Sequence, residues 1–369
     1  MPSPLTIGIA GAGLVGRLLA WQLSAQGHRV EVFDPAPGPE PRFDGQQAAA
    51  LTAAGMLSPL AEMDSSSLQV ARWGWESLVL WPQIAAQLGQ PGLVQQHGSL
   101  LVAHRQDLGA ARRVLARLAS DAADMPQAQP LAPAQLAVLE PSLHGMAHSW
   151  MLPGEGQVDT VAMLSALHAG SVDVHWHWQQ PVNGVLPHTL VLASGAHHRF
   201  DWVVDARGTG AHPQLPVRGV RGEVVWLQLP GHGLTRPVRL LHPRHRVYLV
   251  PRNPDLVVLG ASEVETPDRS PVSLRSAVEL MSAAHSVMPA LAEARILRLD
   301  SNLRPALPDN EPLVVTEPGL LRINGLYRHG WLLAPALVVR ALHLAGLQTT
   351  SSLQLSLTTT EPFHATCAD

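Results

Sequence analysis

Three glycines near the N-terminus, Gly11, Gly13 and Gly16, stand in the spacing G-x-G-x-x-G. Glycines in this spacing allow a tight turn, the close approach of a pyrophosphate to the backbone and the packing of a helix on a strand. Asp34 follows about twenty residues later, where a carboxylate can bind the 2′-hydroxyl of a ribose. The four residues predict a dinucleotide site in which Asp34 would repel a 2′-phosphate. The spacing alone does not separate FAD from NAD.

The elements around these glycines must bring them to the end of a strand and the beginning of a helix. Residues 5–10 form an apolar run typical of a buried parallel strand, and residues 14–25 have helical periodicity. Residues 29–33 predict the next strand, with Asp34 at its tip. This order indicates a Rossmann-like unit whose helix directs free N–H groups at phosphates. The alternative is a glycine-rich turn in an unrelated α/β domain.

Length and composition restrict the class of protein. The chain has 369 residues, which at roughly 150 residues per domain suggests two domains or one large one. A net charge of −4 gives no reason to expect a nucleic acid or an acidic membrane as partner. All 25 basic residues are arginine, which excludes mechanisms that need a lysine, such as those of pyridoxal phosphate.

The single cysteine, Cys367, excludes disulfides within the chain, cysteine-ligated zinc and a redox dithiol. We therefore expect a reducing, cytoplasmic setting. Residues 5–25 are apolar, but Arg17, Gln22 and four glycines argue against a signal peptide or a membrane helix. The nineteen histidines form no convincing ligand pattern with carboxylates, so we expect no metal site.

Four segments carry a resemblance to a known family. Residues 48–59 (AAALTAAGMLSP) are a run of small side chains that would let a planar ligand lie against the backbone. The other segments are WVVDARG at 202–208, YLVPR at 248–252, and LRP at 303–305 leading to GLYRHGWLLAP at 325–335. In this order they resemble the glycine/D-amino acid oxidase family of FAD enzymes, most closely the glycine oxidases of bacterial thiamine biosynthesis. The likeness covers nearly the whole chain to about residue 345.

The resemblance implies an α/β fold with two domains. A Rossmann-like FAD-binding domain would be discontinuous, and a second α+β substrate domain would be built on an antiparallel sheet. The FAD-binding parts would be residues 1–84, 151–214 and 301–348, the substrate parts residues 85–150 and 215–300, and the tail residues 349–369. In the middle part, Asp159 can cap a helix over residues 160–168, followed by a strand over residues 173–178.

The resemblance also implies which residues bind FAD, without a covalent bond. Residues of the small-side-chain run would pass beside the isoalloxazine, and Val182 would meet the adenine through its backbone. The predicted cofactor-binding residues are Gly11, Gly13, Gly16, Asp34, Ala53, Ala54, Gly55, Val182, Gly208, Gly330 and Leu332.

Four residues are candidates for the substrate side of the site. A substrate carboxylate in a dry pocket needs a planar bidentate donor, which is a function of arginine. By the resemblance, Arg304 pairs with the carboxylate, Arg328 lies in the loop that closes the site, and the Tyr248 hydroxyl helps to hold the carboxylate. Met56 would lie over the flavin or the substrate. The alternatives are surface arginines, a tyrosine packed in a sheet and a core methionine.

The reaction implied is the transfer of hydride from the α-carbon of glycine, or another small amino acid or amine, to flavin N5. The imine would hydrolyse to a keto acid and ammonia or enter thiamine thiazole synthesis, and molecular oxygen would be reduced to hydrogen peroxide. A helix beginning at about Ala334-Pro335 would stabilise the reduced flavin with its positive end. Some relatives use a lysine near the flavin for oxygen activation, so oxygen reactivity here must depend on arginine, histidine or the helix end, or be low.

Several interpretations stay open. Glu263 stands where a relative in the family has a methionine, and it can accept a hydrogen bond from a substrate ammonium or face solvent beside Arg252. The basic run 236–246 is either a solvated hairpin or a subunit contact, which leaves a homo-oligomer open. The rival functions are an FAD enzyme that acts on a modified RNA base, which would want a basic face, and a non-catalytic dinucleotide sensor.

Overall fold

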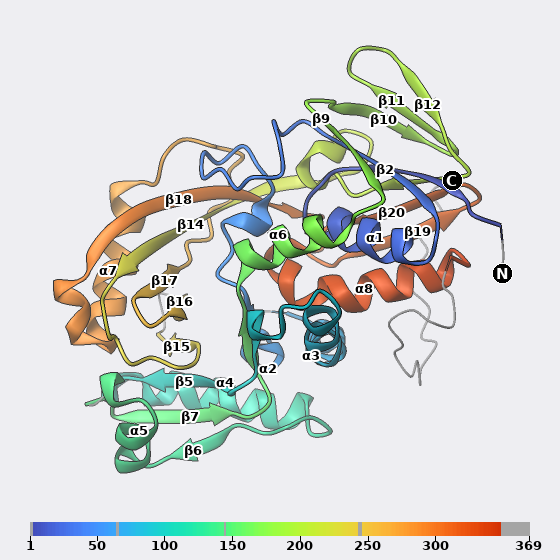
Figure 1. The fold of residues 1–369 in the computed structure, drawn as a ribbon. Helices are drawn as coiled ribbons and strands as arrows, with labels where there is room; N and C mark the ends of the chain where they lie inside the picture. The colour runs from blue at the N-terminus through green and yellow to red at the C-terminus, as the bar shows by residue number, and fades with distance from the viewer. Residues whose placement is uncertain (1–2, 64–65, 144, 243–245, 348–369) are drawn as a thin grey trace.

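A computed structural model describes residues 3–63, 66–143, 145–242 and 246–347 (Figure 1). The tail predicted over residues 349–369, with Cys367, lies outside these ranges. Two large sheets organise the chain, one of six strands and one of eight. Within the described ranges, no helix combines the length and apolarity that crossing a membrane requires.

The six-stranded sheet contains the glycine loop. Its order is β19-β20-β13-β1-β2-β9, and all neighbours are parallel except β19 and β20. The strands are β1 (Thr6–Ala10), β2 (Arg29–Asp34), β9 (Val174–Trp178), β13 (Trp202–Asp205), β19 (Leu313–Glu317) and β20 (Leu320–Asn324). The predicted first and second strands and the helix between them are confirmed, since α1 spans Leu14–Ala25.

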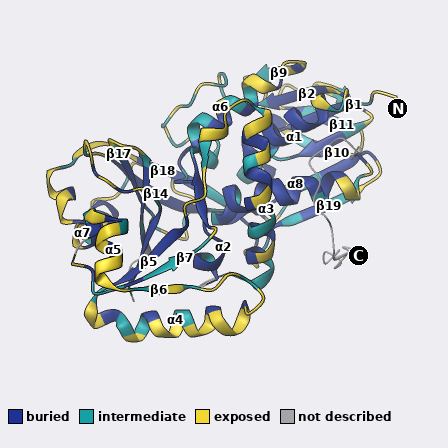
Figure 2. Cartoon of the chain, turned by 60° about the horizontal axis from the view of Figure 1, so that its bottom comes forward, coloured by how far each residue is buried: buried dark blue, intermediate teal, exposed yellow. Residues whose placement is uncertain are grey.

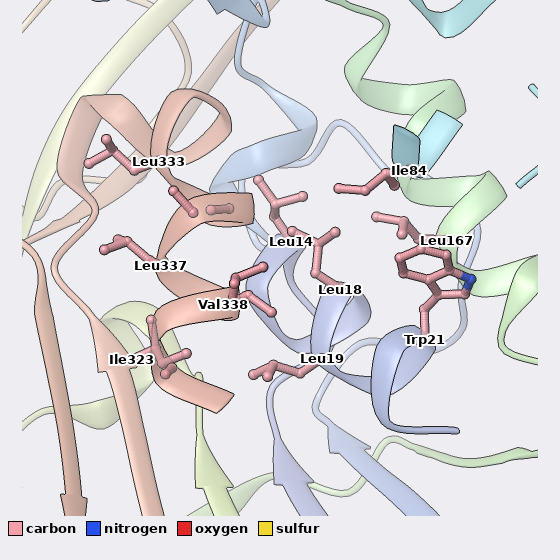
Figure 3. Packing of buried hydrophobic residues seen from close by; sticks show 14 of the residues in the cluster. Leu14, Leu18, Leu19, Trp21, Ile84, Leu167, Ile323, Leu333, Leu337 and Val338 are labelled. Atoms are coloured by element: carbon pink, nitrogen blue, oxygen red, sulfur yellow. The ribbon is translucent and has the colours of Figure 1, made fainter. Parts of the chain in front are cut away.

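Different layers cover the two faces of this sheet. On one face lie the helices α1, α3 (Leu68–Gln87), α6 (Thr160–Gly170) and α8 (Gly330–Leu344). Figure 3 shows Val338 of α8 pointing toward Leu14 and Leu18 of α1 in this core. On the other face, a small sheet of β10 (Val182–Leu186), β11 (Thr189–Leu192) and β12 (His197–Arg199) packs on Phe33 and Val203. Asp159 caps α6 as predicted, because its Oδ1 accepts from the Ala162 N–H at 3.0 Å.

The eight-stranded sheet has the order β18-β14-β17-β16-β15-β5-β7-β6, and only β15 and β5 pair in parallel. Its strands are β5 (Ser99–Ala103), β6 (Gln129–Leu131), β7 (His148–Leu152), β14 (Arg218–Gln228), β15 (Val238–Leu241), β16 (Arg246–Asn253), β17 (Leu256–Gly260) and β18 (Arg295–Ala306). The helices α5 (Pro133–Leu139) and α7 (Leu274–Val287) pack on one face. The helix α4 (Leu108–Asp121) packs near β5 and leaves one side exposed (Figure 2).

The remaining short elements connect the two sheets. They are β3 (Met56–Leu57), α2 (Pro59–Glu62), β4 (Val94–Gln95) and β8 (Gly156–Val158), and the three strands form a small sheet in the order β3-β8-β4. The six-stranded sheet takes its strands from residues 6–34, 174–205 and 313–324, and the eight-stranded sheet from residues 99–152 and 218–306. Strand β18 crosses the boundary predicted at residue 300.

The prediction that the last helix begins at about Ala334-Pro335 is wrong, because α8 begins at Gly330 and contains Pro335. A proline inside a helix has no N–H for the carbonyl four residues earlier, which here belongs to Trp331. The indole N–H of Trp81 on α3 donates to that carbonyl at 2.8 Å. The Ala336 N–H donates to Ser77 Oγ at 3.2 Å, also on α3. The neighbouring helix therefore satisfies the groups that Pro335 would otherwise leave unpaired.

Candidate functional site

A cavity of about 1020 Å³ is lined by residues of both large sheets and of the small-side-chain run. This volume is at the upper end of the range for ligand pockets, about 300–1,000 Å³. Every predicted site residue except Gly16 lines it. The structure therefore brings together residues that are more than three hundred positions apart, such as Gly11 and Arg328.

The glycine loop needs its glycines for two different reasons. Gly11 has φ +103°, and a Cβ there would lie 2.6 Å from the carbonyl oxygen of Ala206. A Cβ on Gly16 would collide with the Gly11 carbonyl, so Gly16 lets α1 pack against the turn without itself facing the cavity. Helix α1 begins after Gly13 with no side-chain cap, so its first N–H groups are free for a phosphate.

Asp34 lies on the cavity wall at the end of β2. Its Oδ2 accepts from the Ala12 N–H at 2.6 Å, and its Oδ1 accepts from the Ala36 N–H at 2.8 Å. These bonds fix the carboxylate beside the glycine loop, at the position where the spacing predicts a ribose partner.

Arg252 holds the small-side-chain run in place. Its guanidinium donates to the carbonyls of Val158 at 2.7 Å and Ala53 at 3.3 Å, and also to that of Ala54. Burial lowers the pKa of Arg252 to about 10. The alternative that Glu263 lies beside Arg252 is wrong, because Arg252 is turned toward these carbonyls and Glu263 pairs with Arg328, although the Glu263 side chain is partly exposed.

Arg304 and Tyr248 reach over two glycines of the eight-stranded sheet. Arg304 on β18 pairs with Val220 of β14, and its side chain extends over Gly222, where a Cβ would collide with the guanidinium. Tyr248 on β16 lies across Gly260 of β17, where a Cβ would collide with the phenol ring. Both side chains line the cavity. Sequence analysis missed Gly222 and Gly260, although an isolated glycine inside a strand indicates a close approach.

The charge of Arg304 has no acidic partner among the described residues, where no carboxylate oxygen lies within 4.0 Å of its nitrogens. Its Nη1 donates to the backbone carbonyls of Ser262 at 3.1 Å and Arg221 at 3.3 Å. Burial raises the pKa of Tyr248, so its hydroxyl keeps its proton and can donate. The arrangement suits an anionic ligand on the cavity side of Arg304.

Arg328 has a different environment, because its guanidinium is already paired. Its Nε and Nη2 donate to Glu62 Oε2 at 2.9 and 2.7 Å, and its Nη1 donates to Glu263 at 2.9 Å. Arg239 donates to the other oxygen of Glu62 at 3.0 Å. Burial by itself would raise the pKa of Glu62, but Arg328 and Arg239 hold it well below its usual range. Glu62 and Glu263 together raise the pKa of Arg328 although burial opposes this.

Sequence analysis missed Glu62 and Arg239, and it misread the basic run 236–246. Arg239 is only 5% exposed, and Arg236 donates to the buried Glu140 at 2.7 Å. The prediction of a solvated hairpin is therefore wrong for these two arginines, which neutralise buried carboxylates. The signals were a lone carboxylate at the end of an apolar stretch and a lone arginine inside an apolar strand, since each needs a buried partner.

The N-terminus of α8 opens on the same cavity, where His329, Gly330 and Leu332 form part of the wall. The helix has no side-chain cap, so its first N–H groups are free for a partly negative ligand. Burial lowers the pKa of His329 to about 4, so its imidazole is neutral near pH 7. The positive potential beside His329 therefore comes from the N-terminus of α8 and not from its imidazole.

The other predicted residues lie along the wall. Met56 is half-buried on β3, and Gly208 follows β13. Val182 begins β10, and its carbonyl accepts from Arg207 Nη1 at 3.1 Å. In the described part of the chain, no three histidine, cysteine, aspartate or glutamate side chains are grouped to hold a metal ion.

The chain is similar to known proteins over most of its length. Residues 6–339 match the family described as FAD dependent oxidoreductase (DAO). The chain belongs to this family. It is 36% identical over 333 residues to a Rhizobium etli protein assigned as the thiamine biosynthesis oxidoreductase ThiO, covering 89% of this chain and 93% of that protein.

Two solved structures show the same fold. Glycine oxidase from Geobacillus kaustophilus has a TM-score of 0.79 at 23% identity, covering 95% of this chain and 96% of that one. Iminodiacetate oxidase (IdaA) from Chelativorans sp. BNC1 has a TM-score of 0.78 at 22% identity, covering 95% and 97%. They confirm the predicted fold class, and membership of the family confirms FAD as the cofactor.

The residues present fit FAD. Two helices without side-chain caps at their N-termini, α1 and α8, begin at one cavity, and Gly11 and Gly55 form part of its wall. A Cβ on Gly55, which has φ +74°, would collide with the Val158 carbonyl. The glycine loop and Asp34 would hold the pyrophosphate and a ribose, and the small-side-chain run would leave room for a flat ring.

Proposed function

We propose that this protein oxidises the α-carbon–nitrogen bond of glycine or another small amino acid or amine to an imine, with molecular oxygen reduced to hydrogen peroxide. The observation that carries the proposal is the Arg304 guanidinium, which faces the FAD cavity beside Tyr248 and has no carboxylate within 4.0 Å in the described part of the chain. A substrate carboxylate is the complementary group.

The residues of the chain would bind and orient the substrate. Arg304 and the protonated Tyr248 hold its carboxylate, which limits the positions that the α-carbon can take. When bound, FAD supplies the acceptor for the hydride that leaves the α-carbon. Met56 and the small-side-chain run line the cavity with largely apolar surface, against which the flat ring would lie.

Two further parts of the site would stabilise charge and close the pocket. The free N–H groups at the start of α8 favour negative charge on the ring system. Arg328, fixed by Glu62, holds the wall segment around Glu263. The chain has no lysine that could activate oxygen. We therefore assign reactivity with oxygen to the N–H groups at the start of α8 and to the neutral His329.

The similarity to the Rhizobium etli protein supports a place in thiamine biosynthesis, where the imine would be used for the thiazole ring. We propose glycine as the first substrate to test, because the solved glycine oxidase shares the fold over 95% of this chain. FAD would be held without a covalent bond, and the enzyme would act in the cytoplasm.

The experiment is anaerobic reduction of the purified flavoprotein by glycine, sarcosine and small D-amino acids, followed by peroxide detection after air is admitted. We expect the flavin absorbance to bleach with at least one of these substrates and peroxide to form. Replacing Arg304 by methionine (R304M) should raise the KM of that substrate by about 100-fold, since a buried charged hydrogen bond is lost. A flavoprotein that no amino acid or amine reduces would contradict the proposal.

A further inference from the structure

The segment that carries Glu263 is anchored on both sides of that residue. The Ser262 N–H donates to the Glu223 carbonyl at 3.2 Å, and its hydroxyl donates to the Glu223 carboxylate at 2.7 Å. Val264 exchanges two backbone hydrogen bonds with Arg221, at 2.9 and 3.0 Å. Arg221 and Glu223 are both buried, so the backbone of Glu263 is fixed at the cavity wall.

The carboxylate of Glu263 is also oriented. Arg328 Nη1 donates to its Oε2 at 2.9 Å, and Arg328 is itself held by Glu62. The Glu263 side chain nevertheless keeps 41% of its surface exposed, and the residue lines the cavity. Negative charge therefore faces the cavity from a built position and not from a mobile loop.

Glu263 and Arg304 open on the same part of the cavity. Arg304 Nη1 donates to the carbonyl of Ser262 at 3.1 Å, and Ser262 directly precedes Glu263. The Arg304 guanidinium thus contacts the residue directly before Glu263, and both side chains line the same cavity. An α-amino acid has the matching pair of charges on neighbouring atoms, since its carboxylate and its ammonium share one carbon.

We propose that Glu263 is an amine-binding residue, which accepts a hydrogen bond from the substrate's nitrogen while Arg304 binds the carboxylate. This inference rests on the proposed function and assigns the substrate class more narrowly. The site selects small carboxylates that carry an amine on the α-carbon over analogues that carry a hydroxyl or hydrogen there. A neutral glutamine at this position can still bond to Arg328 but lacks the charge that favours an ammonium.

The test compares glycine with glycolate, which has a hydroxyl in place of the amine. KM for glycine and Ki for glycolate are measured on the wild-type flavoprotein and on E263Q. We expect E263Q to raise the KM for glycine by about tenfold or more and to leave the Ki for glycolate within about twofold. Flavin content and Tm of the variant check that the fold is kept.

E62Q is the comparison variant, because it disturbs Arg328 from its other side, where the Glu62 carboxylate is already paired with Arg328 and Arg239. We expect E62Q to weaken glycine and glycolate by similar factors. The inference is overturned if E263Q also weakens both ligands equally, or if it leaves glycine unchanged. If the wild-type flavin is not reduced by any amino acid, the proposed function fails instead, so the two failures are distinguishable.

Discussion

Gly222 provides the space that Arg304 occupies above the sheet. Replacing it by alanine (G222A) places a Cβ where the guanidinium now lies, so the Arg304 side chain must move. The backbone pairing of strand β14 can stay as it is. We expect the KM of the amino acid substrate to rise by about tenfold or more, because misplacing a bidentate donor costs most of its binding. Steady-state kinetics measure the KM, and a flavin-binding assay checks that FAD is still bound.

The matched control is G219A on the same strand. A Cβ on Gly219 would approach only the side chain of Leu303, which can adjust. We expect G219A to keep the KM within about twofold. Equal changes in both variants would show that the strand as a whole, and not the position of Arg304, was disturbed.

Glu155 is a fully buried carboxylate between α2 and β5. It accepts from the Leu60 N–H at 2.8 Å and from the Ser99 hydroxyl. Burial raises its pKa from the usual 4.5 to about 7. The folded state therefore binds this proton more tightly than the unfolded state. The contribution of Glu155 to the free energy of unfolding falls as the pH rises from about 4.5 to about 7, and it stays low above that.

Replacing Glu155 by glutamine (E155Q) removes this pH dependence. We expect E155Q to be more stable than the wild type by about 3 kcal/mol at pH 8 and by little at pH 5. Urea unfolding at the two pH values measures the difference, with E293Q at an exposed position as the control. A stability difference that does not change with pH would contradict the assignment.

For single residues, sequence spacing predicts those roles that depend on the local backbone conformation. The positive φ of Gly11 and the packing of Gly16 on the Gly11 carbonyl follow from turn and packing rules within one short segment, whereas the contact of Gly11 with Ala206 is not visible in the local sequence. The pair of Glu62 and Arg239 could not be predicted as a pair, because they are 177 residues apart and meet only when α2 packs on β15. The positions of Arg304 and Tyr248 were predicted from the family resemblance, and the glycines beneath them give the physical reason.

Helices α3 and α8 each contain a proline, and a hydrogen bond links the two helices near these prolines. Pro335 leaves the Trp331 carbonyl to the Trp81 indole, and Pro82 leaves the Leu78 carbonyl to the Gln96 amide, which donates at 2.6 Å. Both helices run through their prolines because side chains of other segments replace the missing N–H groups. A helix start at Pro335 was a reasonable expectation from the sequence, since the distant donor is not visible there.

We expect the substitution W81F to lower the free energy of unfolding by about 1–3 kcal/mol beyond the loss of packing, because the Trp331 carbonyl is then buried and unpaired. In a P335A background the backbone N–H gained at position 335 can donate to that carbonyl, so W81F should cost less. Urea unfolding of the four proteins in a double-mutant cycle measures the coupling. An equal cost of W81F in both backgrounds would mean that the hydrogen bond contributes nothing.

The two sheets are joined across the cavity by the loop of residues 35–48. The Arg298 guanidinium of β18 lies 3.4 Å from the ring centroid of Phe43 in this loop and 4.0 Å from that of Trp226 on β14. Asp300 accepts from Arg298 at 2.7 Å and fixes it. The same loop contributes Gln46 and Gln47 to the wall. This stack therefore holds part of the cofactor site onto the other sheet.

Replacing Phe43 by alanine (F43A) removes one side of the stack. We expect the affinity for FAD to fall by about two- to thirtyfold, the range that corresponds to a cation–π contact. Titration of the apoprotein with FAD, followed by quenching of flavin fluorescence, gives the dissociation constant. The control is L274A, whose side chain is 81% exposed on α7. An unchanged FAD affinity in F43A would show that the loop does not need this contact.

The strand and helix patterns predict the first βαβ unit because its contacts are local, but they do not predict which sheet each later strand joins. Strand β13 lies beside β1 although some 190 residues separate them. The interleaved arrangement was available only through the family resemblance, and the segment boundaries proposed from it remain predictions.

The interleaving also affects how the protein is made. A chain emerging from the ribosome lacks β20 until residue 324 has been added, and α8 follows later still. Until β20 is added, β13 lacks the strand that pairs with one of its edges, and the six-stranded sheet is incomplete. Because the first residues of α8 line the cofactor cavity, we expect a chain truncated before α8 to bind FAD poorly.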